Sequence, residues 1–393
     1  MINIFKSLKF LPIIFAASVF PQTQIYRSDF DLDKKENTSF KGSLAMSGNT
    51  VIFNADNYSL YGINKEKNTV MWERKIGWRS DAAPYIFENS FFYGNYDGNG
   101  RKVHQYDIST GETVRKLDFQ SISTQPYFKN SVMYTTVMAD GGKLMAYDLK
   151  TNSVLWQKNI SFGAEVQPVY LADRIAVNAE DDLWFEIDYM GNFINSTSEY
   201  SVYVDGQKVT SKKFHFLTHD QTPITKEWLQ KNKLTGSEFK TGKNLNYTFL
   251  LSEKYLTTIG NNVKVKSQIN LETAVSPEEY ENEALSAVVS SENEKLWFVY
   301  QNHLIHFDTK KEKVLRDVFL YHWQPHQLIL DGRNIWLISK NNGQLYHLDF
   351  EPDANLNRKI QRENAVMEHY RCDPPNPEKI KAAKEAEEKF KNK

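Results

Sequence analysis

The sequence predicts an all-β protein, a β-propeller of seven blades with one helical or loop insertion and a charged C-terminal tail. Three observations support this prediction: an internal repeat of about 41 residues, two hairpin patterns in each repeat, and a composition rich in aromatic residues. Aromatic residues make up 13% of the 393 residues, and such enrichment favours strands over helices. A chain of this length can bury a large core.

Residues 1–24 have the layout of a secretory signal peptide. Lys6 and Lys9 precede an apolar run over residues 10–20, which is followed by a short polar segment. As a helix this run would reach only ~16 Å, about half of the ~30 Å hydrocarbon thickness, so we expect cleavage rather than a transmembrane anchor. No cysteine follows the run, so we expect no acylated lipoprotein anchor. The protein is therefore predicted to be secreted or periplasmic.

One pattern recurs seven times: a short apolar run, a polar turn, and a second apolar run ending in Asp, Asn or Gly. Each copy has the composition of a β-hairpin. The copies begin at Gly42, Ala83, Gln125, Gln167, Asn246, Leu285 and His326. Successive starts are 41, 42, 42, 79, 39 and 41 residues apart. The long interval is close to one period plus an insertion of about forty residues.

A second hairpin pattern alternates with the first. Its core is an aromatic or aliphatic residue, then Asp or Asn, a polar turn, and a second strand. The copies begin at Leu60, His104, Met145, Trp184, Val265, Leu304 and Leu345. Two hairpins supply the four strands of one blade, so the seven pairs predict seven blades, which we place within about residues 38–360. Eight blades are the alternative, if residues 204–246 contain a degenerate blade.

The order of the hairpins predicts how the final blade is completed. The last copy supplies a single hairpin, so we expect the hairpin at residues 42–57 to complete the final blade and remove a free sheet edge.

The insertion, about residues 205–246, is expected between the second and third strands of a blade. Ile224, Trp228 and Leu229 have helical spacing after Thr225, which predicts a helix. Residues 374–393 form a charged tail, either helical or disordered.

The phrases TVMWERKIG, SVLWQKNIS and YDISTGET resemble the pyrroloquinoline-quinone (PQQ)-type propeller repeat, over roughly residues 40–350. The resemblance implies that Trp72 and Trp156 pack between blades. The family includes quinone-dependent dehydrogenases and cofactor-free propellers such as the outer-membrane assembly lipoprotein. The dehydrogenases commonly place a disulfide of adjacent cysteines beside a calcium-held quinone, whereas this chain has one cysteine, Cys372. The resemblance therefore favours the cofactor-free members.

Composition and motifs favour a binding protein over an enzyme. Lysine and arginine number 48 against 49 acidic residues, so no global field attracts nucleic acid. The sequence lacks a nucleophile elbow, a phosphate loop, a dinucleotide fingerprint and a zinc-protease motif. His322 and His326 have a metal-ligand spacing, but Pro325 argues against the helix that zinc ligation would need. We expect no catalysis, no cofactor and no metal.

A quinone- or metal-dependent enzyme is the alternative function. Asp, Asn and Gly recur in the turns that follow the first hairpin pattern, and carboxylates from four successive repeats could hold a hard cation. The same residue types also supply the conformations that such turns require.

Three unusual features are predicted to share one face of the propeller: the connections at residues 77–81 and 321–326, and the insertion. Trp and Arg in loops dominate binding hot spots. We therefore predict a surface that binds a protein or envelope component, formed by Trp78, Arg79, Trp228, His322 and Trp323. Packing between blades is the alternative interpretation of Trp78 and Trp323. We expect a monomer.

Overall fold

The computed structural model describes residues 23–32, 41–96, 98–139, 141–164, 167–204, 207–211, 216–220, 222–234, 239–275, 285–292 and 294–349, with Lys381 and Glu385. The chain divides into two compact units, one formed by Ile25–His347 and the other by Met1–Gln24 with Leu348–Lys393. The predicted signal peptide and charged tail lie almost entirely outside the described residues. None of the helices in the described ranges is long and apolar enough to span a membrane.

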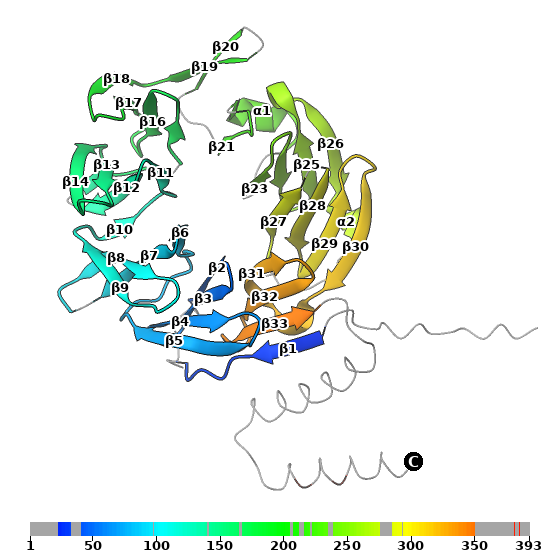
Figure 1. Cartoon of the computed structure of the whole chain (residues 1–393). Helices are drawn as coiled ribbons and strands as arrows, with labels where there is room; N and C mark the ends of the chain where they lie inside the picture. The colour runs from blue at the N-terminus through cyan, green and yellow to red at the C-terminus, as the bar shows by residue number, and fades with distance from the viewer. Residues whose placement is uncertain are drawn as a thin grey trace, which may run out of the picture. The chain divides into compact units, whose positions relative to one another are not determined.

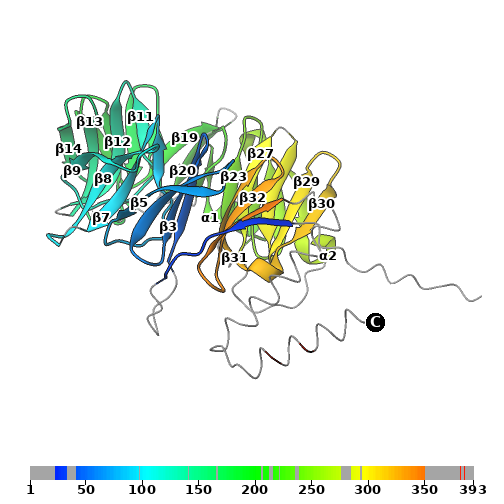
Figure 2. The same cartoon turned by 60° about the horizontal axis from the view of Figure 1, so that its bottom comes forward.

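Seven sheets of four or five strands follow one another along the described chain (Figures 1 and 2). Sheet 1 contains β2 (Ser43–Ser47), β3 (Thr50–Ala55), β4 (Ser59–Asn64) and β5 (Thr69–Lys75). Sheet 2 contains β6 (Tyr85–Phe87), β7 (Ser90–Tyr96), β8 (Arg101–Asp107) and β9 (Thr113–Leu117). Sheet 3 contains β10 (Ser121–Ile122), β11 (Tyr127–Lys129), β12 (Val132–Ala139), β13 (Gly141–Asp148) and β14 (Ser153–Asn159). Sheet 4 contains β15 (Val169–Tyr170), β16 (Arg174–Asn178), β17 (Trp184–Asp188) and β18 (Phe193–Thr197).

The remaining sheets follow after a long connection. Sheet 5 contains β23 (Lys240–Lys243), β24 (Thr248–Leu251), β25 (Tyr255–Ile259) and β26 (Val265–Asn270). Sheet 6 contains β27 (Ala287–Glu292), β28 (Lys295–Tyr300), β29 (His303–Asp308) and β30 (Lys313–Phe319). Sheet 7 contains β31 (Pro325–Asp331), β32 (Asn334–Ser339), β33 (Leu345–Asp349) and β1 (Thr23–Arg27).

The all-β prediction is confirmed, and all seven copies of the first pattern form antiparallel hairpins. These hairpins are β2–β3, β6–β7, β11–β12, β15–β16, β24–β25, β27–β28 and β31–β32. The number of blades stays a prediction. The described residues between β18 and β23 hold two two-stranded ribbons, β19 (Tyr200–Val204) with β20 (Gln207–Ser211) and β21 (Phe216–Leu217) with β22 (Pro223–Ile224).

The same connection carries the predicted helix. Helix α1 spans Lys226–Lys231, and the Thr225 side chain caps it by accepting a hydrogen bond from the Trp228 backbone N–H. The connection joins the last strand of sheet 4 to the first strand of sheet 5, so the expected position between a second and a third strand is wrong. The predicted insertion range, residues 205–246, also includes β23. This strand is part of sheet 5 and not of the insertion, because it pairs with β24.

The expected closure by residues 42–57 is wrong as well. That hairpin forms the first two strands of sheet 1, and β1 instead lies beside β33 as the fourth strand of sheet 7 (Figure 1). The Ser28 backbone N–H donates to Leu345 O at 2.9 Å, and the Leu345 N–H donates to the Ser28 hydroxyl at 2.9 Å. Ser28 also donates its hydroxyl to Gln344 Oε1 at 2.5 Å. A strand before the repeat therefore completes the last sheet.

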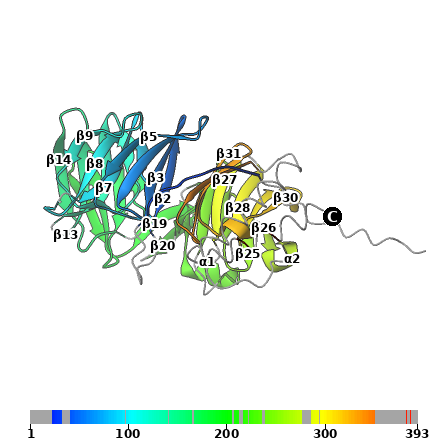
Figure 3. The same cartoon turned by 90° about the horizontal axis from the view of Figure 1, so that it is seen from below.

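Sheet 5 departs from the predicted repeat in its strand order. The copy at Val265 was expected to form a hairpin, but β26 continues into helix α2 (Leu271–Val275) (Figure 3). The Asn270 side chain accepts a hydrogen bond from the Glu272 backbone N–H at 2.9 Å, an arrangement that favours a helix start. The first-pattern hairpin β24–β25 thus occupies the two central positions, and β23 supplies the remaining strand.

Neighbouring sheets pack through apolar layers, as the blades of a propeller do. Between sheets 1 and 2, Trp72 packs with Phe91 and Tyr106 and donates its indole N–H to Ile108 O at 2.9 Å. A Cβ atom at Gly62 would lie 2.0 Å from the Trp72 ring, and one at Gly111 would lie 2.5 Å from it. Two glycine backbones therefore make the space for the indole.

The same arrangement recurs between sheets 3 and 4. Trp156 donates its indole N–H to Tyr189 O at 3.1 Å, and a Cβ atom at Gly191 would lie 2.5 Å from the indole ring. Gly111 and Gly191 have φ of +67° and +86°, which glycine adopts without steric cost. The packing of Trp72 and Trp156 between sheets is confirmed.

Candidate functional site

The connection between β5 and β6, residues 76–84, is fixed at its start by backbone contacts. The N–H groups of Ile76 and Gly77 both donate to Tyr58 O, at 3.0 and 3.2 Å. Gly77 has a φ of +60°, and a Cβ atom there would lie 2.6 Å from the Tyr96 carbonyl oxygen. Only glycine fits this close turn, which brings the Trp78 indole against Gly94 of β7.

Asn54, at the end of β3, holds the next residues of this connection. Its side-chain amide donates to Trp78 O at 3.3 Å and accepts from the Ser80 backbone N–H at 3.0 Å. The Tyr93 hydroxyl donates to the same Asn54 oxygen at 2.9 Å and shares a hydrogen bond with Ser43. Burial raises the pKa of Tyr93. The connection is thus fixed by a buried polar network that stays hydrogen-bonded.

Arg79 forms an ion pair inside the protein. Its guanidinium lies 2.5 Å from Asp56 Oδ1, and the exposed fractions of the two side chains are only 16% and 10%. The guanidinium also lies 5.3 Å from the Tyr58 ring centre. Because these contacts join the connection to the turn between β3 and β4, Arg79 positions its neighbour Trp78.

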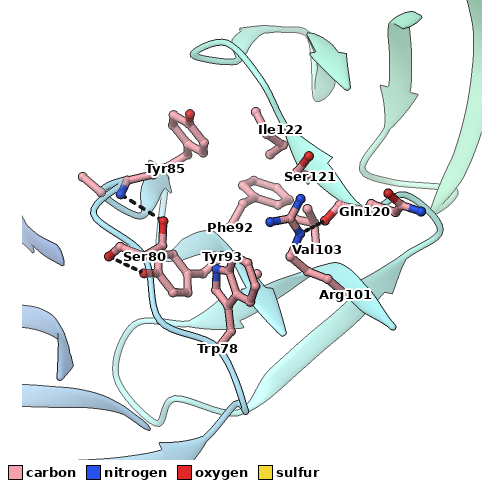
Figure 4. A pocket seen from close by; sticks show the side chains of 13 residues that line it. Trp78, Ser80, Tyr85, Phe92, Tyr93, Arg101, Val103, Gln120, Ser121 and Ile122 are labelled. Atoms are coloured by element: carbon pink, nitrogen blue, oxygen red, sulfur yellow. Dashed lines mark hydrogen bonds between the residues drawn. The ribbon is translucent and has the colours of Figure 1, made fainter. Parts of the chain in front are cut away.

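Beside Trp78 lies a pocket of about 260 Å³. It opens between this connection, strands β6–β8 of sheet 2, and β10 of sheet 3 (Figure 4). Its described lining residues are Trp78, Ser80, Ala82, Ala83, Tyr85, Phe92, Tyr93, Gly94, Arg101, Val103, Gln120, Ser121 and Ile122.

Arg101, the first residue of β8, lies at this pocket and was not predicted as a site residue. Its Nε donates to Gln120 O at 3.0 Å, and its guanidinium lies 4.5 Å from the Trp78 ring centre. Partial burial lowers the pKa of Arg101, although an arginine remains charged at neutral pH. Its long-range contacts to residues 78 and 120 left no signal in the local sequence.

The other predicted residues lie on other elements. Trp228, on α1, donates its indole N–H to Val263 O at 3.2 Å and packs against a cluster that includes Leu250 and Ile259 of sheet 5. Trp323 lies in a 3-10 helix, η2 (Tyr321–Trp323), and is buried with 4% of its surface exposed. The His322 ring meets the Trp323 ring edge-on, 5.2 Å away. The structure therefore brings Trp78 and Arg79 together, and places the other three apart from the Trp78 pocket.

The side chain of His326 links sheet 7 to the Trp78 connection. Its Nε2 lies 3.0 Å from Asp81 Oδ1, and Gln327 donates to Asp81 O at 2.5 Å. Within the described part of the chain, no three His, Cys, Asp or Glu side chains gather as a metal site would require. Asp181, one of the turn carboxylates, accepts from the Ser161 hydroxyl and the Leu183 backbone N–H.

Comparison with protein families gives a match over most of the chain. The family described as outer membrane protein assembly factor BamB matches residues 23–165 and 99–355. No match was found among curated proteins.

Two solved structures are similar to the chain at low identity. BamB from Moraxella catarrhalis is 11% identical, with 78% of this chain and 71% of that chain covered and a TM-score of 0.34. The computationally designed Ika8 protein is 13% identical, with 79% and 96% covered and a TM-score of 0.50. At such identities, the likeness to the designed protein supports the fold alone.

Proposed function

Since the chain belongs to the family of the outer membrane protein assembly factor BamB, we propose that it is an exported, non-catalytic scaffold that binds a protein component of the cell envelope. The family match supports the general role, and the signal-peptide layout predicted for residues 1–24 supports export. N-terminal sequencing of the mature protein tests export, with a start near residues 20–24 expected. A mature chain that retains Met1 would contradict it.

The observation that carries this proposal is the ordered connection at Trp78, which lies beside a pocket. The connection is anchored by Asn54 and by the Arg79–Asp56 ion pair, while the Trp78 indole stays only partly buried beside a pocket. A surface that is already ordered loses little conformational entropy on binding. Tryptophan is also among the residue types that dominate interface energies.

The five predicted residues take different roles in this proposal. Trp78 contacts the partner directly, and Arg79 holds the connection in place. Trp323 is buried and supports η2, which presents the partly buried His322. Trp228 is half-buried on α1, apart from the Trp78 pocket, and a contact between Trp228 and the partner stays a prediction.

Quantitative binding to the native partner tests the proposal. The full-length exported protein is used to isolate the envelope protein that it retains, and affinity is then measured for Trp78→Ala and for Phe162→Ala. Phe162 is the matched control because it lies in the corresponding connection between sheets 3 and 4 and is 72% exposed. We expect at least tenfold weaker binding for Trp78→Ala alone. Equal affinities for both variants, or stoichiometric retention of added pyrroloquinoline quinone and calcium after gel filtration, would contradict the proposal.

A further inference from the structure

The Trp78 pocket contains one charged group among its described lining residues. Arg101 is that group, and the others are aromatic, aliphatic, serine, alanine, glycine or glutamine residues. No carboxylate belongs to this described lining. A partly buried cation at an apolar pocket favours an anion as the incoming group, because the low local dielectric strengthens their attraction.

The orientation of Arg101 is set by two contacts that leave its terminal nitrogens available. Nε donates to Gln120 O, and the guanidinium stacks over the Trp78 indole. Among hydrogen bonds between described residues, the Gln120 bond is the one that Arg101 makes. Figure 4 shows the guanidinium directed toward Ser121 and Gln120 at the pocket wall. Its two terminal NH₂ groups form the fork that matches the two oxygens of a carboxylate.

The walls and size of the pocket restrict what can accompany that carboxylate. Phe92, Val103 and Ile122 provide apolar surface, and Ser121 provides a hydroxyl. A volume of about 260 Å³ lies below the usual range for sites of drug-sized ligands, about 300–1,000 Å³. The pocket therefore suits one side chain better than a large cofactor.

We propose that this pocket receives an Asp or Glu side chain of the partner protein, with the carboxylate paired to Arg101 and its methylene groups against Trp78 and Phe92. This inference rests on the proposed function, because the carboxylate belongs to the protein that the scaffold binds. Partial burial disfavours the charged form of Arg101, and an entering carboxylate would offset this effect by stabilising the charge.

The first experiment tests the chemistry of the pocket with a small probe. The full-length exported protein is labelled with 5-fluorotryptophan, the Trp78 resonance is assigned with Trp78→Phe, and the protein is titrated with 3-phenylpropanoate or 3-phenylpropanamide. We expect the acid to shift the Trp78 resonance and to bind at least tenfold more tightly than the amide. Arg101→Met keeps the aliphatic stem on the indole, and this variant should lose the preference for the acid.

Lys102→Met is the matched control, because Lys102 is the adjacent cation and pairs with Asp118 at 2.6 Å, outside the described lining of the pocket. This variant should bind the acid as the unchanged protein does. If Arg101→Met unfolds, Arg101→Lys keeps the charge, loses the fork, and should bind the acid several-fold more weakly. Equal binding of acid and amide, or an undiminished preference in a folded Arg101 variant, would overturn the proposal.

The second experiment separates this inference from the proposed function. Affinity for the native partner is measured for Arg101→Met and Trp78→Ala. Loss of at least tenfold in both variants supports both proposals. If Trp78→Ala loses affinity for the partner and Arg101→Met does not, the proposed scaffold function is supported and the proposed carboxylate site is overturned. If the acid binds and both variants keep full partner affinity, the pocket does not receive the partner's side chain, and the Trp78 surface is not the interface.

Discussion

Trp72 and Trp78 are six residues apart and both contact sheet 2, yet their surroundings differ. The Trp72 indole lies between Gly62 and Gly111, its N–H is bonded to Ile108 O, and 6% of its surface is exposed. The Trp78 indole lies against Gly94 on one side and the Arg101 guanidinium on another, beside an open pocket. The comparison shows that two tryptophans close in sequence have different flanking groups, and we propose that these groups decide whether such a residue packs in the core or binds a partner.

The largest expected effect is on stability at Trp72. Trp72→Ala removes a buried ring from the layer between sheets 1 and 2, which should lower the free energy of unfolding by about 3–5 kcal/mol. Urea denaturation measures this change. Met71→Ala is the control, because the Met71 side chain is 40% exposed and its loss should cost under about 1 kcal/mol. A similar small cost at both positions would show that the indole is not part of the core.

Trp323 sharpens the comparison, because it was predicted as a binding residue and is 4% exposed. Its burial predicts that Trp323→Ala lowers the free energy of unfolding by about 3 kcal/mol, with affinity for the partner retained by the folded fraction. Denaturation and binding are measured on the same preparation. Unchanged stability together with lost binding would make Trp323 a direct contact, as Trp78 is proposed to be.

Substitution of Gly111 tests the contact between this glycine and the Trp72 ring. Gly111→Ala places a Cβ atom 2.5 Å from the Trp72 ring at a φ of +67°, whereas Gly98→Ala has a φ of +90° and no atom within 4 Å. Both variants carry backbone strain of about 1–3 kcal/mol. We expect Gly111→Ala to have the lower melting temperature, because only it also displaces the indole. Equal melting temperatures would mean that Trp72 moves aside freely.

The smallest expected effect is a pH dependence of stability, which arises from the carboxylates of Asp107 and Asp148 in the turns of the repeat. Hydrogen bonds from the Ser109 hydroxyl at Asp107 and from the Lys150 backbone N–H at Asp148 hold the pKa values of these carboxyls below their usual range. A pKa that is lower in the folded state stabilises the fold above the unfolded value of about 3.9 and loses that contribution as the pH falls through the folded value. Melting temperature should therefore fall below about pH 4, and less steeply when both residues are replaced by Asn. Parallel curves would contradict this assignment.

The sequence predicted the hairpins because their signals are local: alternating apolar runs and turn residues recur at a fixed spacing. The Thr225 cap of α1 was visible for the same reason. Closure by β1 was not visible, because β1 precedes the repeat and Ser28 meets Leu345 across 317 positions of sequence. Pairing over such a separation depends on the whole fold rather than on neighbouring residues.

The candidate site also combines features that local sequence signals predict with features that depend on long-range contacts. Trp78 was predicted from its residue type and its place in a connection. Arg101 was missed because it reads as an ordinary first residue of a strand, and its contacts come from residues 78 and 120. The pocket is likewise formed by two sheets and a connection, which no repeat pattern describes.

The central claim is that the layer between sheets 1 and 2 is structural at Trp72 and recognises a partner at Trp78. The most direct test is to measure, for Trp78→Ala, both the free energy of unfolding and the affinity of the folded protein for its native partner. We predict a smaller loss of stability than for Trp72→Ala, because the Trp78 indole is only partly buried against the same apolar cluster, and at least tenfold weaker binding. Destabilisation by several kcal/mol with unchanged affinity of the folded fraction would contradict the claim, because Trp78 would then be a packing residue like Trp72.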